Sequence, residues 1–178
     1  MQPMRYLSQW LSENADNRHY LFTLRDLRPL FTELSDNTFK TLLSRAVHSK
    51  LLMRLCRGLY LNQKALPNDG LLLFHAAAVL RANEFNYISL ETALSDAGVI
   101  SQIPVNLITI MSSGRSNTIS CGNYGTIEFV HTDQKPANLI KSLAYDHLCG
   151  MWRANVELAL RDMKATHRNM DLIDWDHK

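Results

Sequence analysis

Between residues 35 and 48 the apolar positions recur every three or four residues, the spacing of an amphipathic helix. These apolar residues form one stripe: Phe39, Leu42, Leu43, Ala46 and Val47. Ser35 and Asp36 come just before the stripe and can cap the helix N-terminus. At about 100° per residue, the polar side chains fall on the opposite side, namely Asn37, Thr41, Ser44, Arg45 and His48. The pattern therefore predicts a helix with a hydrogen-bonding outer face.

Two short β-like runs follow this helix within residues 51–61, and the chain folds back between them at Arg57 and Gly58. Arg54 and Arg57 lie in this predicted hairpin. A polar-faced helix followed by a two-stranded wing that carries arginines is typical of a winged helix-turn-helix, so DNA binding is the leading hypothesis.

The elements expected before this helix complete the same motif. The spacing predicts a first helix over Pro3–Glu13, a short strand over Tyr20–Thr23, and a second helix over Leu24–Glu33 that Thr23 caps. Pro29 inside the second helix removes a hydrogen bond, so we expect that helix to be short or kinked. The order helix, short strand, helix, helix, hairpin is that of a winged helix.

The best domain boundary is the run of turn residues at 65–70, where Pro, Asn, Asp and Gly succeed one another. We therefore predict a winged helix-turn-helix over residues 1–66 and a second domain over residues 67–178. In the second domain we expect an apolar helix over residues 71–82 and a short helix over residues 90–97, which Ser89 caps and Gly98 ends. We expect strands over residues 87–88, 107–111, 118–120 and 125–131.

The chain is expected to end in two helices, over residues 138–149 and 152–167, with a turn or kink at Gly150. The predicted fold class is α+β: an N-terminal winged helix-turn-helix followed by a mixed α/β C-terminal domain with a small sheet and C-terminal helices.

Composition indicates a folded protein in a reducing compartment. Of the 178 residues, 46% are apolar, and the aromatic residues are spread along the chain. No apolar run reaches membrane-spanning length, and the N-terminus lacks the apolar core of a signal peptide. Three widely spaced cysteines form no C-x-x-C pair. We therefore expect a cytoplasmic protein with reduced cysteines and no membrane partner.

The net charge of +2 hides an asymmetry between the two predicted domains. Residues 1–66 contain ten Lys and Arg against five Asp and Glu, which gives +5, whereas the remaining residues contain nine against twelve, which gives −3. Five of the cations lie between Lys40 and Arg57, where the winged-helix pattern already points to DNA.

Two segments resemble AbiE-type (AbiEi family) antitoxins, the antitoxins of type IV toxin–antitoxin systems in bacterial abortive infection. Arg57-Gly58-Leu59-Tyr60 resembles the end of their wing, and residues 87–100 resemble their stretch Y-[IL]-S-x-x-[ST]-A-L-x-x-x-G-[LI]-[IT]. Pro104 and the predicted strands at residues 108–110 and 125–129 follow in the family's order.

The resemblance implies a winged-helix transcriptional regulator that binds double-stranded operator DNA, represses its own operon and takes part in phage defence. It further implies a C-terminal domain, with Arg115 and Lys135 exposed, that antagonises a nucleotidyltransferase-like toxin, with or without direct contact. The alternative is a stand-alone winged-helix transcriptional regulator whose second domain binds an effector or makes a dimer.

The candidate DNA-binding residues follow from the winged helix. The side chains expected to face the major groove are Thr41, Ser44, Arg45 and His48, and Arg45 is the best base reader because its fork matches the two acceptors of guanine. Asn37 and Thr38, at the helix N-terminus, can donate to a phosphate. The DNA backbone would be held by Arg54 and Arg57 with Lys40 and Lys50, joined by Arg25 or Arg28.

Catalytic interpretations are weaker, so we expect no enzyme, cofactor or metal site. A nuclease built on Glu128 would need a lysine two residues later, where Val130 stands. Asp146, His147 and Cys149 are interpreted as a surface polar cluster. The acidic tail at residues 171–177 is interpreted as a frayed terminus.

Overall fold

The computed structural model describes residues 2–101 and 106–176, and it divides into two compact units, Met1–Leu72 and Leu73–Lys178. We call these the N-terminal and C-terminal units. The boundary predicted at residues 66 and 67 lies shortly before this division. Pro104, which the family resemblance included, lies outside the described residues.

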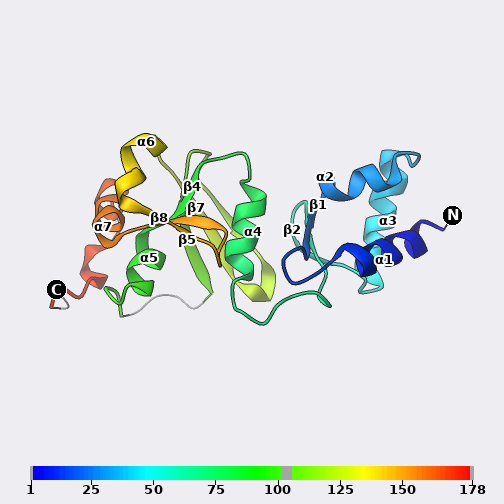
Figure 1. Cartoon of the computed structure of the whole chain (residues 1–178), viewed down its shortest axis with the longest axis horizontal. Coiled ribbons are helices and arrows are strands. Elements are labelled where there is room, and N and C mark those ends of the chain that lie inside the picture. Colours follow the sequence, from blue (N-terminus) through cyan, green and yellow to red (C-terminus); the bar gives the residue numbers. More distant parts are fainter. Residues whose placement is uncertain (1, 102–105, 177–178) are drawn as a thin grey trace. The chain divides into compact units, whose positions relative to one another are not determined.

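The N-terminal unit is a winged helix, as predicted. Its strands form an antiparallel sheet in the order β1-β3-β2, in which β3 lies between the other two. Figure 1 shows its helices beside this sheet. The elements in chain order are α1 (Pro3–Asn14), β1 (Leu21–Thr23), α2 (Leu24–Leu27), η1 (Arg28–Phe31), α3 (Asp36–His48), β2 (Met53–Cys56) and β3 (Leu59–Leu61).

Local sequence signals determine where these helices begin and end. Thr23 and Asp26 form a capping box, in which the Thr23 backbone N–H donates to the Asp26 carboxylate at 2.7 Å. Helix α2 ends at Leu27, and a 3-10 turn carries Pro29, because proline cannot continue the α-helical ladder. The expected short second helix is therefore confirmed.

The C-terminal unit contains a six-stranded mixed sheet in the order β6-β7-β5-β4-β9-β8. Helix α5 packs against α7 and β5, and Figure 1 shows α5 and α7 on one side of the strands and α4 on the other. The strands are β4 (Asn86–Ile88), β5 (Leu107–Ser112), β6 (Asn117–Ser120), β7 (Thr126–His131), β8 (Leu143–Asp146) and β9 (Met151–Ala154). The helices are α4 (Leu72–Leu80), α5 (Leu90–Asp96), η2 (Gly122–Tyr124), α6 (Pro136–Leu139), η3 (Ile140–Ser142), α7 (Val156–Ala165) and η4 (Met170–Leu172).

The prediction of a helix over residues 138–149 is wrong. Only α6 and η3 are helical there, and β8 follows, paired with β9 in an antiparallel hairpin. The second predicted helix starts later than expected, at Val156, because residues 151–154 form β9. Strand β9 pairs with β4 on its other side and buries Met151 and Ala154. At β9, pairing with β4, a strand distant in sequence, thus overrode a periodicity that also fits a helix.

Ser89 stands at the N-cap of α5, but its side chain does not cap the helix as predicted. Its hydroxyl donates instead to the Asp162 carboxylate at 2.6 Å, and the Tyr87 hydroxyl donates to the same oxygen at 3.0 Å. Burial raises the pKa of Asp162 above its usual range. These two bonds join β4 and the start of α5 to α7.

Arg168 connects the end of the chain to the rest of the C-terminal unit. Its guanidinium donates to both carboxylate oxygens of Glu91 and to both of Glu128, at 2.8 to 3.0 Å. The acidic tail is not frayed where the structure describes it, because Ile173 makes a β-bridge to Ile100. The contact with Ile100 thus orders the C-terminal segment around Ile173, although its composition alone indicates a frayed terminus.

Replacing Glu128 by Gln should destabilise the C-terminal unit near neutral pH and less so in acid. Hydrogen bonds from Arg168 hold the pKa of Glu128 below its ordinary value of 4.5, so ionised Glu128 contributes stability above about pH 4.5. This contribution is lost as the pH falls through the lowered pKa. We expect a loss of about 1.5–3 kcal/mol in the free energy of unfolding at pH 7, measured by urea unfolding.

The control is Glu157→Gln, on the exposed first turn of α7, which should change stability little at either pH. A Glu128→Gln effect that stays constant from pH 7 to well below pH 4 would contradict the assignment.

Candidate nucleic-acid interface

Helix α3 presents one polar face because its apolar stripe is buried. Phe39, Leu42, Leu43 and Ala46 lie in the core of the N-terminal unit. The Ser35 hydroxyl accepts from the Thr38 backbone N–H at 3.2 Å and caps the helix, as the sequence predicts. All the predicted binding residues on the helix are exposed: Asn37, Thr38, Lys40, Thr41, Ser44, Arg45 and His48.

Two of these residues already make local hydrogen bonds. The Thr38 backbone N–H donates to the Ser35 hydroxyl, and the hydroxyl groups of Thr38 and Ser35 share a hydrogen bond of 2.8 Å. The Thr41 hydroxyl donates to the Asn37 carbonyl at 2.9 Å, which leaves its oxygen as an acceptor. Of the polar groups on this face, the side chains of Ser44, Arg45 and His48 are therefore the better candidates for base contacts.

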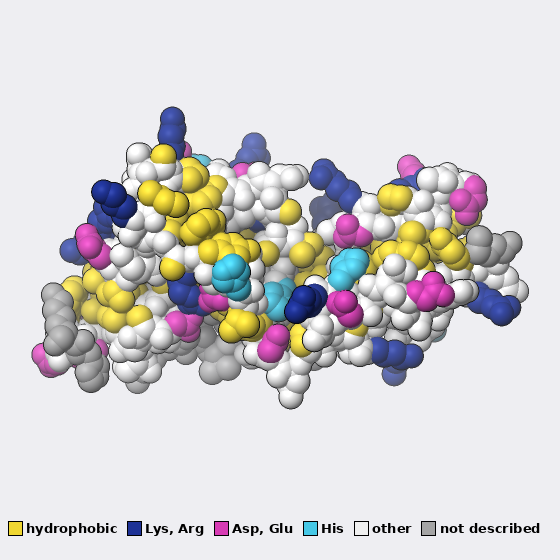
Figure 2. All heavy atoms as spheres, in the orientation of Figure 1, with side chains coloured by type: hydrophobic (Ala, Val, Ile, Leu, Met, Phe, Trp, Pro, Cys, Tyr) yellow, Lys and Arg dark blue, Asp and Glu magenta, His cyan; other side chains and the backbone are white. Residues whose placement is uncertain are grey.

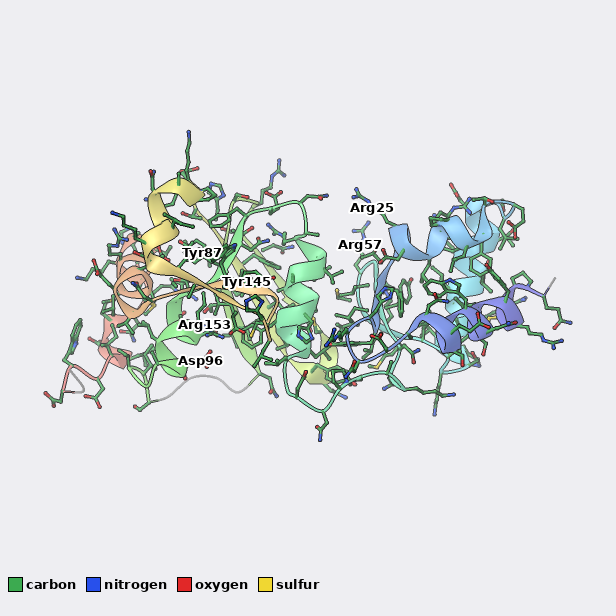
Figure 3. The ribbon with its side chains drawn as sticks, viewed as in Figure 1. Arg25, Arg57, Tyr87, Asp96, Tyr145 and Arg153 are labelled. Atoms are coloured by element: carbon green, nitrogen blue, oxygen red, sulfur yellow. The ribbon has the colours of Figure 1, made fainter. Side chains whose placement is uncertain are left out.

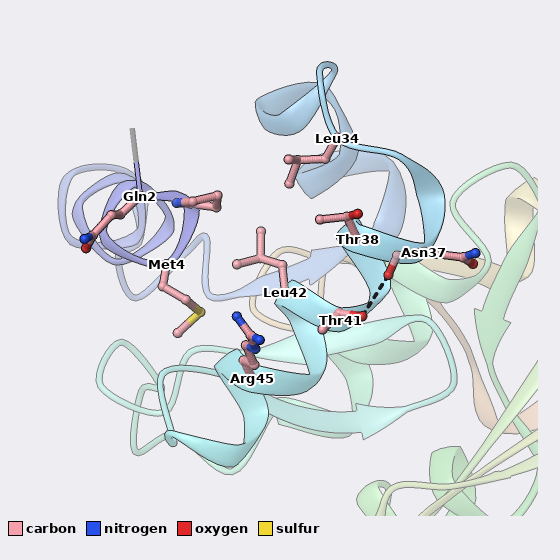
Figure 4. A pocket seen from close by; sticks show the side chains of 9 residues that line it. Gln2, Met4, Leu34, Asn37, Thr38, Thr41, Leu42 and Arg45 are labelled. Atoms are coloured by element: carbon pink, nitrogen blue, oxygen red, sulfur yellow. Dashed lines mark hydrogen bonds between the residues drawn. The ribbon is translucent and has the colours of Figure 1, made fainter.

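A groove of about 500 Å³ runs along this face between α3 and the first turn of α1. Figure 4 shows the Arg45 side chain in the groove, beside Leu42 and near Met4, whereas the Asn37 side chain points away from it. Gln2 and Met4 were not among the predicted site residues. No sequence signal identifies them, because only the packing of α1 against α3 brings them together.

The wing carries two further exposed cations. Arg54 on β2 and Arg57 at the turn are exposed, and Gly58 takes the left-handed conformation that closes the turn, with φ +76°. Lys50 ends α3 in the same conformation, with φ +62°. The Lys50 N–H donates to the Val47 carbonyl, and the Leu51 N–H donates to the Ala46 carbonyl. These two hydrogen bonds form a helix-ending motif that orders the Lys50 backbone.

The exposed cations are available for phosphates. Within residues 2–101 and 106–176, no carboxylate lies at ion-pair distance from the five cations between residues 40 and 57, which are Lys40, Arg45, Lys50, Arg54 and Arg57. Arg25 is also exposed at the start of α2. Figure 3 labels Arg25 and Arg57, and Figure 2 shows dark blue side chains gathered in that region.

Arg28 is different, and its suggested role in DNA contact is not supported by its surroundings. Its guanidinium pairs with Asp36 at 3.1 Å, donates to the Leu34 carbonyl and lies over the Phe39 ring. These contacts hold the turn before α3, so Arg28 positions the helix.

The residues considered for catalysis have structural partners. Glu128 is held by Arg168, and Asp146 accepts from Arg153 and from the backbone N–H groups of Leu148 and Cys149. Cys149 is buried rather than part of a surface cluster, and burial raises the pKa of its thiol to about 12. In the described part of the chain, no group of three or more His, Cys, Asp or Glu is arranged to hold a metal ion.

Among the helices that the structure describes, none has both the length and the apolar character needed to cross a membrane.

Comparison with known families finds a match for the winged helix. Residues 11–63 match the family model described as "Transcriptional regulator, AbiEi antitoxin". The match covers α2, α3 and the wing, and it ends before the stretch at residues 87–100 on which the sequence resemblance partly rests. A search among curated proteins found no match.

Proposed function

We propose that this chain is an antitoxin that binds operator DNA through α3 and the wing, because residues 11–63 match the model of the AbiEi antitoxin family of transcriptional regulators. The observation that carries the proposal is the exposed polar face of α3, together with five cations on α3, the turn after it and the wing that make no ion pair with the residues the structure describes. Polar side chains on a helix can hydrogen-bond to base edges in the major groove, and cations near it can neutralise phosphates.

In this proposal the residues divide into two roles. The side chains that face the bases are Ser44, Arg45 and His48, joined by Thr41. Asn37 and Thr38, at the start of the helix, lie where they can contact a phosphate. Lys40, Lys50, Arg54 and Arg57 contact the backbone and hold the helix in register. The ordered turn at Lys50 and the short hairpin support this division, since they attach the cations to rigid elements.

We further propose that binding represses the chain's own operon and that the C-terminal unit antagonises a nucleotidyltransferase-like toxin in a type IV system. The family description supports the antitoxin role in general terms. The resemblance at residues 87–100 supports the rest, and these residues form the end of β4, α5 and the turn after it.

A stand-alone transcriptional regulator is the second candidate. One observation favours it: the family match ends at residue 63, so it includes none of the C-terminal unit. In that case the C-terminal unit would bind an effector or another copy of the chain rather than oppose a toxin.

Replacing Arg54 and Arg57 by Ala together should weaken binding to all DNA sequences. The slope of log affinity against log salt concentration should fall by roughly 0.9 for each lost phosphate contact, because fewer counterions are released on binding. The measurement is fluorescence anisotropy with operator and unrelated duplexes over a salt series. Arg115→Ala, at an exposed site in the C-terminal unit, is the control. Unchanged affinity and slope in the double variant would remove the wing from the mechanism.

Replacing Arg45 by Ala should instead reduce discrimination between sequences. Loss of a bidentate contact to guanine costs about 1–3 kcal/mol for the preferred site, whereas binding to unrelated DNA should change much less. Arg45→Lys is the matched variant: it keeps the charge and the salt slope but loses the fork, so it should also lose specificity. If both variants keep the wild-type preference, Arg45 does not read a base.

Co-expression tests the antitoxin role separately from DNA binding. A nucleotidyltransferase-like protein encoded next to this chain should arrest growth alone, and co-expression of the full chain should relieve the arrest. Growth curves with and without induction measure this effect. Persistent arrest with a well-expressed, folded chain would favour the stand-alone regulator.

A further inference from the structure

The two outer strands of the six-stranded sheet differ in character. Strand β6 at one edge carries Asn117, Thr118 and Ser120, which are exposed and polar. Strand β8 at the other edge begins with Leu143, Ala144 and Tyr145 and carries no charged residue before Asp146. Charged residues, prolines and bulges are the usual protections of a sheet edge, and the start of β8 has none of them.

The hydrogen bonds of the hairpin show which backbone groups of β8 point outward. The Asn155 N–H donates to the Ser142 carbonyl, and the Gly150 N–H donates to the Asp146 carbonyl. In an antiparallel pair, the backbone N–H and C=O groups of successive residues point alternately toward and away from the partner strand. The backbone groups that point toward β9 are therefore those of Ser142, Ala144 and Asp146. The N–H and C=O groups of Leu143 and Tyr145 therefore point away from the sheet.

Large apolar side chains surround this edge. Ile140 before β8 is 56% exposed and Leu148 after it is 75% exposed, and Tyr145 on the strand is also exposed. Figure 2 shows yellow side chains gathered over α6 and β8 on this face of the C-terminal unit. Isolated exposed apolar residues are ordinary, but a group of them beside an open strand edge indicates a binding surface.

The edge is also held in place. Tyr145 stacks edge-on against Trp152 with ring centres 5.3 Å apart, and Figure 3 labels it on this hairpin. His75 on α4 makes a 2.7 Å hydrogen bond to the Leu148 carbonyl. An ordered strand loses little conformational entropy when a partner pairs with it.

Charge at the two ends of β8 indicates which partner fits. Lys141 lies just before its start, whereas Asp146 lies at its end. Asp146 pairs with Arg153, which also pairs with Asp96 on α5, so this group of three residues carries a net negative charge. A second β8 running antiparallel would bring the positive end of each copy toward the negative end of the other. A parallel arrangement would bring like charges together.

We propose that two copies of this chain pair through β8, antiparallel and about a two-fold axis at Ala144. In this register Leu143 of each copy faces Tyr145 of the other, so all the outward N–H and C=O groups of these residues gain partners. The small side chain of Ala144 meets its own copy at the axis. Ile140 comes near Leu148 of the second copy at both ends.

This pairing does not require the proposed function, since all its residues lie in the C-terminal unit. If both hold, a two-fold dimer presents two winged helices and predicts an operator with inverted half-sites. Four strand hydrogen bonds and a few apolar contacts make a small interface, so the dimer should dissociate on dilution.

The test is sedimentation velocity of the full chain over a concentration series, with Ala144→Glu and Ala144→Lys. Either variant places two like charges at the axis and should raise the dimer dissociation constant by at least about tenfold. Each variant should be monomeric alone, and an equimolar mixture should form one-to-one dimers, because opposite charges then meet. Ser120→Glu adds a charge to the β6 edge and should leave the dissociation constant unchanged.

Thermal unfolding followed by circular dichroism checks that the variants fold. If an Ala144 variant does not fold, Leu148→Glu in the exposed loop is used in its place to disrupt the same interface. A wild-type chain that stays monomeric at every concentration overturns the proposal and leaves β8 to a strand of another protein. The proposal is also overturned if a mixture of the Ala144→Glu and Ala144→Lys variants forms no dimer, or if Ser120→Glu raises the dimer dissociation constant. Binding to a single operator half-site, measured on the monomeric Ala144→Glu variant, reports on the proposed function independently.

Discussion

The burial of the apolar stripe of α3 is the constraint on which the candidate DNA-binding surface depends. Phe39, Leu42 and Ala46 pack into the core of the N-terminal unit, so the helix cannot rotate about its axis without exposing them. The outward direction of Ser44 and Arg45 is therefore a consequence of hydrophobic packing. Arg28 strengthens this constraint by holding the turn before the helix through Asp36 and Phe39.

Charged side chains have different roles in the two units. In the N-terminal unit, the cations from Lys40 to Arg57 stand without ion pairs among the described residues, as a surface for phosphates would require. In the C-terminal unit, Arg153 and Arg168 each bind two carboxylates and connect elements distant in sequence. Arg153 and Arg168 thus stabilise the fold of the second unit, whereas the arginines of the wing remain available to a ligand.

The C-terminal unit combines a rigid interior with one open edge. Asp162, Tyr87 and Ser89 fix β4 and α5 against α7, and the sheet continues outward through β9 to β8. An edge strand that is ordered but unprotected suits association, because the fold already supplies the ordered backbone. The same unit would also provide the surface for a toxin or an effector, and the polar β6 edge contrasts with the apolar surroundings of β8.

Local chemistry determined most of the winged helix from the sequence alone. Ser35 caps α3, Pro29 shortens the second helix, and Gly58 takes the left-handed conformation that the turn of the wing requires. In the C-terminal unit, Gly98 likewise takes the left-handed conformation at the end of α5. The exposed polar face of α3 also followed from spacing, since one buried stripe leaves only one opposite side. Each of these signals acts over a few residues and needs no distant partner.

Only the tertiary structure decided the features that depend on distant partners. Residues 151–154 have a spacing that fits a helix, and they form β9 because β4, a strand far away in the sequence, pairs with them; β8 in turn pairs with β9. The Ser89 side chain could have capped its own helix, but Asp162 lies within its reach, and Arg28 could have reached solvent, but Asp36 and Phe39 hold it. The physical reason is common to all three: a short segment can satisfy its hydrogen bonds in several ways, and the partner that packs against it determines which one forms.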